Sequence, residues 1–262
     1  MTVLATSQGA WLLWVVLPYV AIATFVVGNI WRYRTDQVHW TSRSSQLLES
    51  RWLRLGSPLF HFGLLAVIGG HVLGILVPES WTEAVGISEN AYHWIAAIPG
   101  TLAGTAMIAG LALLIVRRVR DARVSRVTTT MDVAVLVLLA FMTATGMWNT
   151  VWHSLIEGGY NYRETVSPWF RGLFVADPQP SLMTGTAIPL SYQLHAVGGW
   201  LLFLIWPFTR LVHAWSVPIA YLRRSPILYR SRAPSAARAG AGGLTDYHAS
   251  ALGAGEEPAS VR

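Results

Sequence analysis

Four histidines inside apolar stretches are the strongest chemical signal in this sequence. Two stretches carry two histidines each: His61 and His71 in Leu59–Val77, and His195 and His213 in Tyr192–Val217. A titratable side chain within a membrane span costs free energy and usually marks a functional site. Neutral imidazoles are also common metal ligands. We therefore expect these four side chains to bind metal.

The composition predicts an integral membrane protein. Of the 262 residues, 53% are hydrophobic and only 12% are charged. Uncharged runs of about 20 residues are long enough to cross a bilayer as helices. The sequence predicts five such helices: Trp11–Ile30, Leu59–Val77, His93–Val116, Met131–Trp152 and Tyr192–Val217. The expected fold is an all-α, five-helix transmembrane bundle.

Arginines predict the orientation of these helices. The chain has no lysine, so its formal net charge of +6 comes from arginine. Only Arg163 and Arg171 fall in loops on one side of the predicted bundle, and about 17 fall on the other. We expect the N-terminus outside and the C-terminus in the cytoplasm. Lipid headgroups explain this basic charge better than nucleic acid does.

Two compositional features limit what else the chain can do. It has no cysteine, which excludes disulfides, thiolate-held iron–sulfur clusters and covalently attached c-type haem. Any iron–sulfur partner is therefore a separate polypeptide. We expect residues 1–232 to form the five-helix domain. Residues 233–262 are rich in Ala, Gly, Ser and Pro, which predicts a disordered cytoplasmic tail.

The predicted topology pairs the histidines by depth. The second and fifth helices run in opposite directions, so His61 lies level with His213 and His71 level with His195. Zinc usually binds four ligands around one tetrahedral centre. Two pairs at two depths instead suit two b-type haems, each with two axial imidazoles. The expected bundle is therefore a dihaem cytochrome b.

Helix geometry supports the pairing only in part. The 18 residues from His195 to His213 make five full turns, which places both on one face of a straight helix. The rise would be about 27 Å there but only about 15 Å from His61 to His71. A kink at Pro207 would reduce this mismatch.

Glycines cluster beside three of the four histidines. They leave room for a flat ligand, although each one alone fits ordinary helix packing better. The residues concerned are Gly63, Gly70, Gly74, Gly198 and Gly199.

The motifs resemble the cytochrome b (gamma) subunit of membrane-bound respiratory nitrate reductase. The resemblance covers roughly residues 10–232. It rests on Trp31–Arg34, Ser44–Gln46, Ser57–His71 (SPLFHFGLLAVIGGH), Trp206–Pro218 (WPFTRLVHAWSVP) and Tyr221. The combination of H-x9-H on one span with H-x17-H on the last is specific.

This resemblance implies a subunit of a bacterial cytoplasmic membrane that oxidises quinol, either menaquinol or ubiquinol, near the outer face. It implies His61 and His213 as ligands of the proximal haem b, and His71 and His195 as ligands of the distal one. Electrons would pass to a cytoplasmic iron–sulfur (beta) subunit. A molybdenum-containing (alpha) subunit would then reduce nitrate.

One departure from the family concerns the quinol site. Family members can carry a lysine before the third span, and this chain has none. His93 is the nearest basic residue, and we expect it to hydrogen-bond the quinol or accept its proton. Gly70 would shape the same pocket beside His71. A cap on the third helix is an equally ordinary role for His93.

Three alternative functions stay open at this point. A dihaem cytochrome b of a heterodisulfide- or sulfite-reductase-type complex has the same architecture and a different cytoplasmic partner. A metal transporter would use the histidines as a relay, but the third and fourth spans look too apolar for it. A membrane anchor without cofactor leaves the histidines unexplained.

Overall fold

The chain is almost entirely helical in the part that a computed structural model describes, which is residues 7–36, 40, 44–185 and 188–215. Four helical segments there are long and apolar enough to cross a membrane. They are Gln8–Thr35, Arg51–Leu76, Glu89–Arg120 and Thr130–Ile156. They match the first four predicted spans, so the all-α membrane fold is confirmed to that extent.

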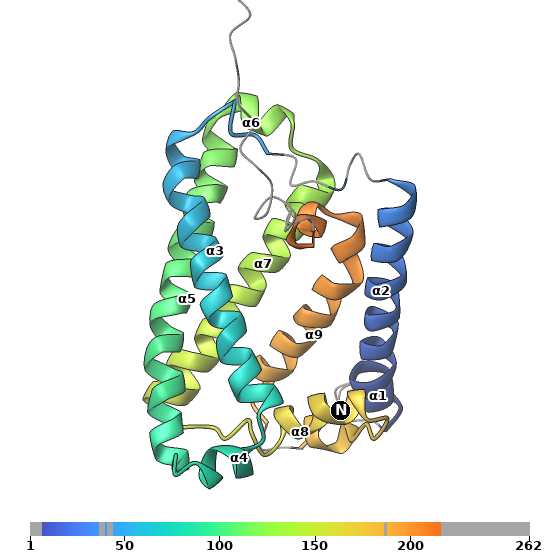
Figure 1. Cartoon of the computed structure of the whole chain (residues 1–262), viewed down its shortest axis with the longest axis vertical. Coiled ribbons are helices and arrows are strands. Elements are labelled where there is room, and N and C mark those ends of the chain that lie inside the picture. Colours follow the sequence, from blue (N-terminus) through green and yellow to red (C-terminus); the bar gives the residue numbers. More distant parts are fainter. Residues whose placement is uncertain (1–6, 37–39, 41–43, 186–187, 216–262) are drawn as a thin grey trace, which may run out of the picture. The chain divides into compact units, whose positions relative to one another are not determined.

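In Figure 1 the second, third and fourth of these segments lie together, and α9 (Leu190–Ile205) stands between the fourth and the first. The first comprises α1 (Ser7–Trp11), a π-helical turn (Leu12–Val16) and α2 (Leu17–Thr35). The second comprises α3 (Arg51–His71) and the π-helical η4 (Val72–Leu76). The third is α5 (Glu89–Arg120), and the fourth comprises α7 (Thr130–Trp148) and the π-helical η5 (Asn149–Ile156). The second and fourth segments thus both widen into π-helix at their carboxyl ends.

The last helix differs from its prediction. In place of a continuous helix over Tyr192–Val217, α9 covers only Leu190–Ile205 and has 16 residues. A 3₁₀ turn follows over Trp206–Phe208, then extended Thr209, then a second 3₁₀ segment, η8 (Arg210–Ala214). Pro207 lacks the N–H that would continue the helix. The fifth span stays a prediction, and its last two residues, 216 and 217, lie outside the described residues.

This break removes the argument that His195 and His213 share a face of one straight helix. Their relative position depends on the turn at Trp206–Phe208, not on five regular turns. The same break removes the predicted mismatch in axial distance, because the chain between them is not one straight rod.

Side-chain caps stabilise the starts of α5 and α7. Thr129 and Asp132 form a reciprocal capping box at the start of α7. The Ser88 side chain accepts a hydrogen bond from the backbone N–H of Ala91 at the start of α5. Capping satisfies backbone N–H groups at each helix start that have no partner within the helix.

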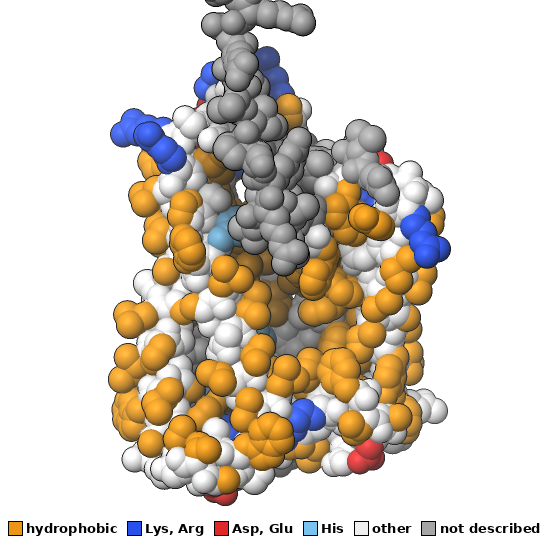
Figure 2. Space-filling model, viewed as in Figure 1, with side chains coloured by type: hydrophobic (Ala, Val, Ile, Leu, Met, Phe, Trp, Pro, Cys, Tyr) orange, Lys and Arg blue, Asp and Glu red, His pale blue; other side chains and the backbone are white. Residues whose placement is uncertain are grey.

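Short helices close the two ends of the bundle. At one end lie α4 (Glu79–Ala84) and α8 (Val166–Phe174), and at the other lies α6 (Ala122–Arg126), as Figure 1 shows. In Figure 2, hydrophobic side chains cover the flank between these ends, and arginines gather at the end that carries α6. We call this the arginine end, and we call the opposite end the acidic end after Glu79, Glu83 and Glu89. Apolar flanks of this kind suit contact with lipid.

The chain divides into two units, residues 1–217 and 218–262. The second lies outside the described residues. The predicted domain limit at residue 232 and the disordered tail therefore stay predictions.

Helices α3 and α5 pack closely against each other, and glycine makes this contact possible. A Cβ on Gly63 would lie 2.7 Å from the backbone nitrogen of Met107 and 2.9 Å from the carbonyl oxygen of Ala103. Gly110 faces the backbone of Phe60 in the same way. Small residues at such contacts let helix backbones approach closely in membranes.

We predict that Gly63→Val destabilises the bundle, because the added side chain forces α3 away from the backbone of α5. Gly69→Ala is the matched control, because a Cβ there meets nothing within 4 Å. Thermal unfolding in detergent should show a midpoint lowered by several degrees for Gly63→Val alone. Equal midpoints for the two variants would contradict the packing role of Gly63.

Candidate functional site

The structure brings the four histidines together as two pairs. The ring centres of His61 and His213 are 6.0 Å apart, and those of His71 and His195 are 5.9 Å apart. Each pair joins α3 to the C-terminal region, through η8 in the first case and α9 in the second. These are the partners that the depth argument predicts.

Hydrogen bonds fix the orientation of three of these rings. In each ring, Nδ1 lies within hydrogen-bond distance of a backbone carbonyl oxygen three or four residues earlier. The pairs are His61 with Ser57 at 2.8 Å, His71 with Val67 at 2.8 Å and His213 with Arg210 at 2.6 Å. A carbonyl oxygen only accepts, so Nδ1 must donate, and Nε2 then carries the lone pair. This tautomer is the one that binds metal through Nε2.

His195 is held by a side chain instead. Its Nδ1 lies 3.0 Å from Oγ1 of Thr145 on α7, and that hydroxyl lies 2.9 Å from the carbonyl oxygen of Phe141. Because the hydroxyl donates to this carbonyl, it accepts from the imidazole. A Cβ on Gly146 would lie 3.0 Å from Cε1 of His195, so glycine there admits the ring. All four histidines thus reach the same hydrogen-bonded state.

The first pair lines a cavity at the arginine end, which we call the inner cavity. Its volume is about 460 Å³, and His61 and His213 both line it. Four arginines line it as well: Arg54, Arg117, Arg118 and Arg210. The rest is mainly apolar side chains of α3, α5 and α7, so the inner cavity combines two imidazoles with an apolar wall and a cationic rim.

Asp132 organises the cationic rim. Its carboxylate accepts from Nε of Arg210 at 2.6 Å and lies 3.4 Å from a guanidinium nitrogen of Arg118. The Asp132 side chain is 5% exposed. One carboxylate faces two guanidinium groups, so the rim keeps a positive charge that suits an anionic group of a ligand.

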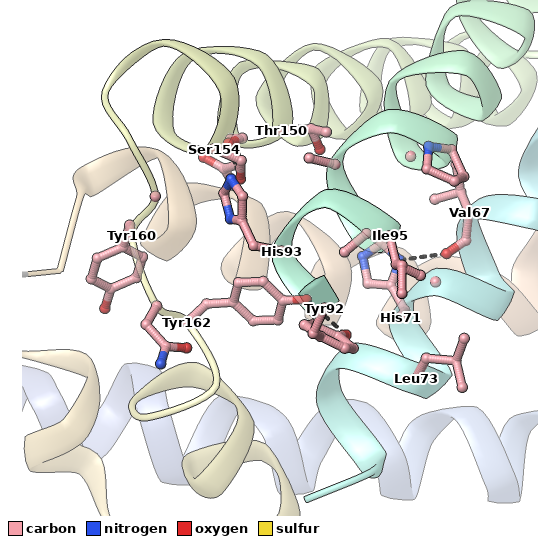
Figure 3. Close-up of a pocket in the computed structure, with 18 of the residues that line it drawn as sticks. Val67, His71, Leu73, Tyr92, His93, Ile95, Thr150, Ser154, Tyr160 and Tyr162 are labelled. Carbon is pink, nitrogen blue, oxygen red and sulfur yellow. Dashed lines mark hydrogen bonds between the residues drawn. The ribbon is translucent and has the colours of Figure 1, made fainter. Parts of the chain in front are cut away.

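His71 lines a second cavity at the acidic end, which we call the outer cavity (Figure 3). Its volume is about 720 Å³. Both residues predicted for a quinol site, His93 and Gly70, line it. In Figure 3 the ring of His93 on α5 points toward Ser154 of η5, and His71 projects from α3. The outer cavity thus lies beside one histidine pair and has its own titratable side chain.

The buried Arg163 directly follows the loop Gly158–Tyr162, which lines the outer cavity. Arg163 donates to Glu89 at 3.0 Å and to Thr82 at 2.9 Å, and its guanidinium lies 3.9 Å from the ring centre of Tyr92. The neighbouring hydroxyls of Tyr92 and Tyr162 are 3.4 Å apart. Burial raises the pKa of Tyr162, so its phenol stays protonated. In the sequence, Arg163 serves only to predict the orientation of the helices. The residues that it contacts lie more than 70 positions away along the chain.

The glycines beside the histidines divide into two groups. Gly70 lines the outer cavity, and a Cβ there meets nothing within 4 Å. By contrast, Gly63 contacts the backbone of α5, Gly74 contacts Tyr162, and Gly198 contacts Phe141 and Met142. Of these four, only Gly70 leaves space for a ligand, whereas Gly63 and Gly198 permit helix packing and Gly74 makes room for the side chain of Tyr162.

A tetrahedral zinc site finds no support in the described part of the chain. No three His, Asp or Glu side chains come together there in a group that could hold a metal ion. The histidines occur as separate pairs, which suits a metal whose remaining ligands come from elsewhere.

Sequence patterns identify the four histidines but not the residues that hold them in place. Thr145 stands 50 residues before His195, and no local motif connects them. Asp132 is recognisable as a helix cap, but its pairing with Arg210 spans 78 residues. Only the carbonyl partners three or four residues before a histidine follow from helix geometry.

Comparison with known proteins decides the family. The family model for the nitrate reductase gamma subunit matches residues 10–232. The chain belongs to the nitrate reductase gamma subunit family. It is 45% identical to the nitrate reductase gamma chain of Bacillus subtilis, over 84% of this chain and 98% of that one. It is 34% identical to the respiratory nitrate reductase 1 gamma chain of Escherichia coli, over 83% and 95%.

A longer relative carries the same region. The chain is 50% identical to the nitrate reductase-like protein NarX of Mycobacterium tuberculosis, over 84% of this chain. It spans about a third of that protein, because the match covers 34% of its length. The resemblance to the gamma subunit family that the sequence motifs indicate is confirmed.

Proposed function

We propose that this gamma-family chain is the quinol-oxidising, dihaem cytochrome b subunit of a respiratory nitrate reductase. The proposal rests mainly on the two histidine pairs. In each pair the ring centres are about 6 Å apart, and Nδ1 of each ring is hydrogen-bonded. Family membership supplies the context, and the two cavities supply the space.

The geometry of each pair fits an axially ligated haem. An imidazole nitrogen lies about 2 Å from a bound metal ion, so rings on opposite sides of one ion have centres about 6 Å apart. Both observed separations agree with this value. His61 and His213 would hold the proximal haem b, and His71 and His195 the distal one. Haem iron in such a site accepts and releases single electrons.

The rim of the inner cavity fits the carboxylates that haem b carries. Arg118 and Arg210 present guanidinium groups at the cavity, and Asp132 holds both in place. Arginine pairs with carboxylates through two parallel hydrogen bonds. These side chains would orient the proximal haem and offset its negative charge.

The outer cavity fits a quinol. It lies beside His71, it is mostly apolar, and its volume of about 720 Å³ is within the usual range for small-molecule sites. His93 would accept a proton from the bound quinol, since a neutral imidazole has one nitrogen with a free lone pair. Gly70 would admit the ring of the quinol next to His71. The contacts of Arg163 would hold the loop Gly158–Tyr162 in place beside the cavity.

The arrangement separates charge across the membrane. Quinol oxidation at the acidic end would release protons outside, and the electrons would leave at the arginine end for an iron–sulfur subunit in the cytoplasm. Nitrate would be reduced on a further, molybdenum-containing subunit. Each charge moved across the membrane stores about 2.3 kcal/mol per 100 mV. This direction rests on the predicted orientation, with the arginine end inside the cell.

Single histidine variants test the haem assignment. We predict that His61→Ala loses the proximal haem and His71→Ala the distal haem, because each variant removes one of the two imidazoles that would hold that haem. Haem per chain, extracted from the purified protein, should fall from about two to about one in each variant.

His153→Gln is the control for this experiment. His153 lies at the acidic end, where its ring bonds Glu157 at 2.6 Å and Ser191 at 3.1 Å, and it lines neither cavity. It should keep both haems. Two haems retained in either ligand variant would refute the assignment of that histidine.

We predict that His93→Ala slows quinol-dependent haem reduction by about a hundredfold, the usual contribution of a positioned proton acceptor. Haem content and reduction by dithionite should not change, since His93 lies outside both histidine pairs. Stopped-flow measurement with a quinol analogue gives the rate. An unchanged rate would leave His93 with a role in capping or packing only.

A further inference from the structure

A buried amide in the outer cavity has no partner within the described part of the protein. Asn149 lines this cavity and is only 6% exposed. Its Oδ1 makes no hydrogen bond to any described residue. Leaving a buried acceptor unpaired costs free energy, so native proteins rarely do so without a reason. A hydrogen-bond partner for Oδ1 could lie in the cavity that Asn149 lines.

The backbone gives this amide a distinctive position. Asn149 is the first residue of η5, where α7 widens from α-helix into π-helix. Asn149 also stands four residues after Thr145, the residue that holds His195, so the two share one face of the helix. Asn149 therefore lies one turn closer to the acidic end than the second histidine pair.

The neighbouring hydroxyls on this wall each donate their proton to a carbonyl oxygen of the same helix. Thr150 donates to the carbonyl oxygen of Gly146 at 3.0 Å, and Ser154 donates to that of Asn149 at 3.4 Å. Both line the outer cavity with Asn149. Among the described residues of this wall, Oδ1 of Asn149 is thus the buried side-chain polar atom that has no hydrogen-bond partner.

We propose that Asn149 binds the quinol directly, with its amide oxygen accepting a hydrogen bond from a quinol hydroxyl. This inference rests on the proposed function of the outer cavity. Quinol hydroxyls donate, and a carboxamide oxygen accepts without titrating. His93 on α5 and Asn149 on η5 then contact the substrate from two helices, one taking the proton and the other fixing the position of the ring.

The test uses the complete membrane-bound complex with its partner subunits. The variants are Asn149→Ala, which removes the amide, and Asn149→Thr, which keeps an oxygen that can accept, as Thr145 does for His195. The rate of haem reduction is measured against the concentration of menadiol. Haem content, the dithionite-reduced spectrum and the haem midpoint potentials are measured on the same samples.

Asn29→Ala is the matched control. Asn29 stands on α2, its Oδ1 is also buried without a partner in the described residues, and it lines neither cavity. It should leave the KM for menadiol unchanged. We expect Asn149→Ala to raise this KM about tenfold, the effect of one good hydrogen bond, and Asn149→Thr to raise it less. Haem content, spectrum and potentials should match those of the unmodified protein.

Other outcomes overturn the inference in distinct ways. An unchanged KM in Asn149→Ala means that the amide does not contact the quinol. Changed haem content, spectrum or potentials in both Asn149 variants, with KM unchanged, mean that the amide serves the distal haem instead. If menadiol fails to reduce the haems of the unmodified complex, the proposed function itself fails, and this inference with it.

Discussion

The pairing of four imidazoles beside two cavities organises the structure. Each ring has two nitrogens, and a hydrogen bond donated by one of them leaves the lone pair on the other. A carbonyl of the same helical turn accepts from Nδ1 in three rings, and Thr145 accepts in the fourth. Fixing Nδ1 in this way leaves the lone pair of each neutral ring on Nε2, the atom through which we propose that each pair holds a haem. The structural need for hydrogen bonds and the chemical need for a ligating nitrogen therefore have the same solution.

Pairing the rings places a second constraint on the C-terminal region. His61 and His71 lie on one regular helix, so their partners must come at the spacing that α3 sets. A straight helix cannot meet it, because 18 residues would rise about 27 Å. The chain ends α9 at Ile205, turns at Pro207 and resumes at Arg210. The buried contact of the Arg32 side chain with the carbonyl oxygen of Pro207, at 2.6 Å, stabilises that turn from α2.

Much of this could be predicted from the sequence, for identifiable reasons. Long apolar runs give the first four spans, and opposite helix directions give the histidine pairs. Pro207 predicts a break, although not that the helix would stop there. The contacts of Arg163 with Glu89 and of Thr145 with His195 join segments 74 and 50 residues apart. Periodicity carries no information on such contacts, because it describes one helix at a time. Asn149 could not be identified from the sequence either, because only the structure shows that its Oδ1 is buried beside a cavity without a partner among the described residues.

The most direct test of the account is a haem count on the purified protein, with a reduced-minus-oxidised absorption spectrum. Two paired imidazole sites predict about two b-type haems per chain, both reducible by a quinol analogue. A folded protein without haem would contradict the account, and the four histidines would then need another ligand to explain their geometry.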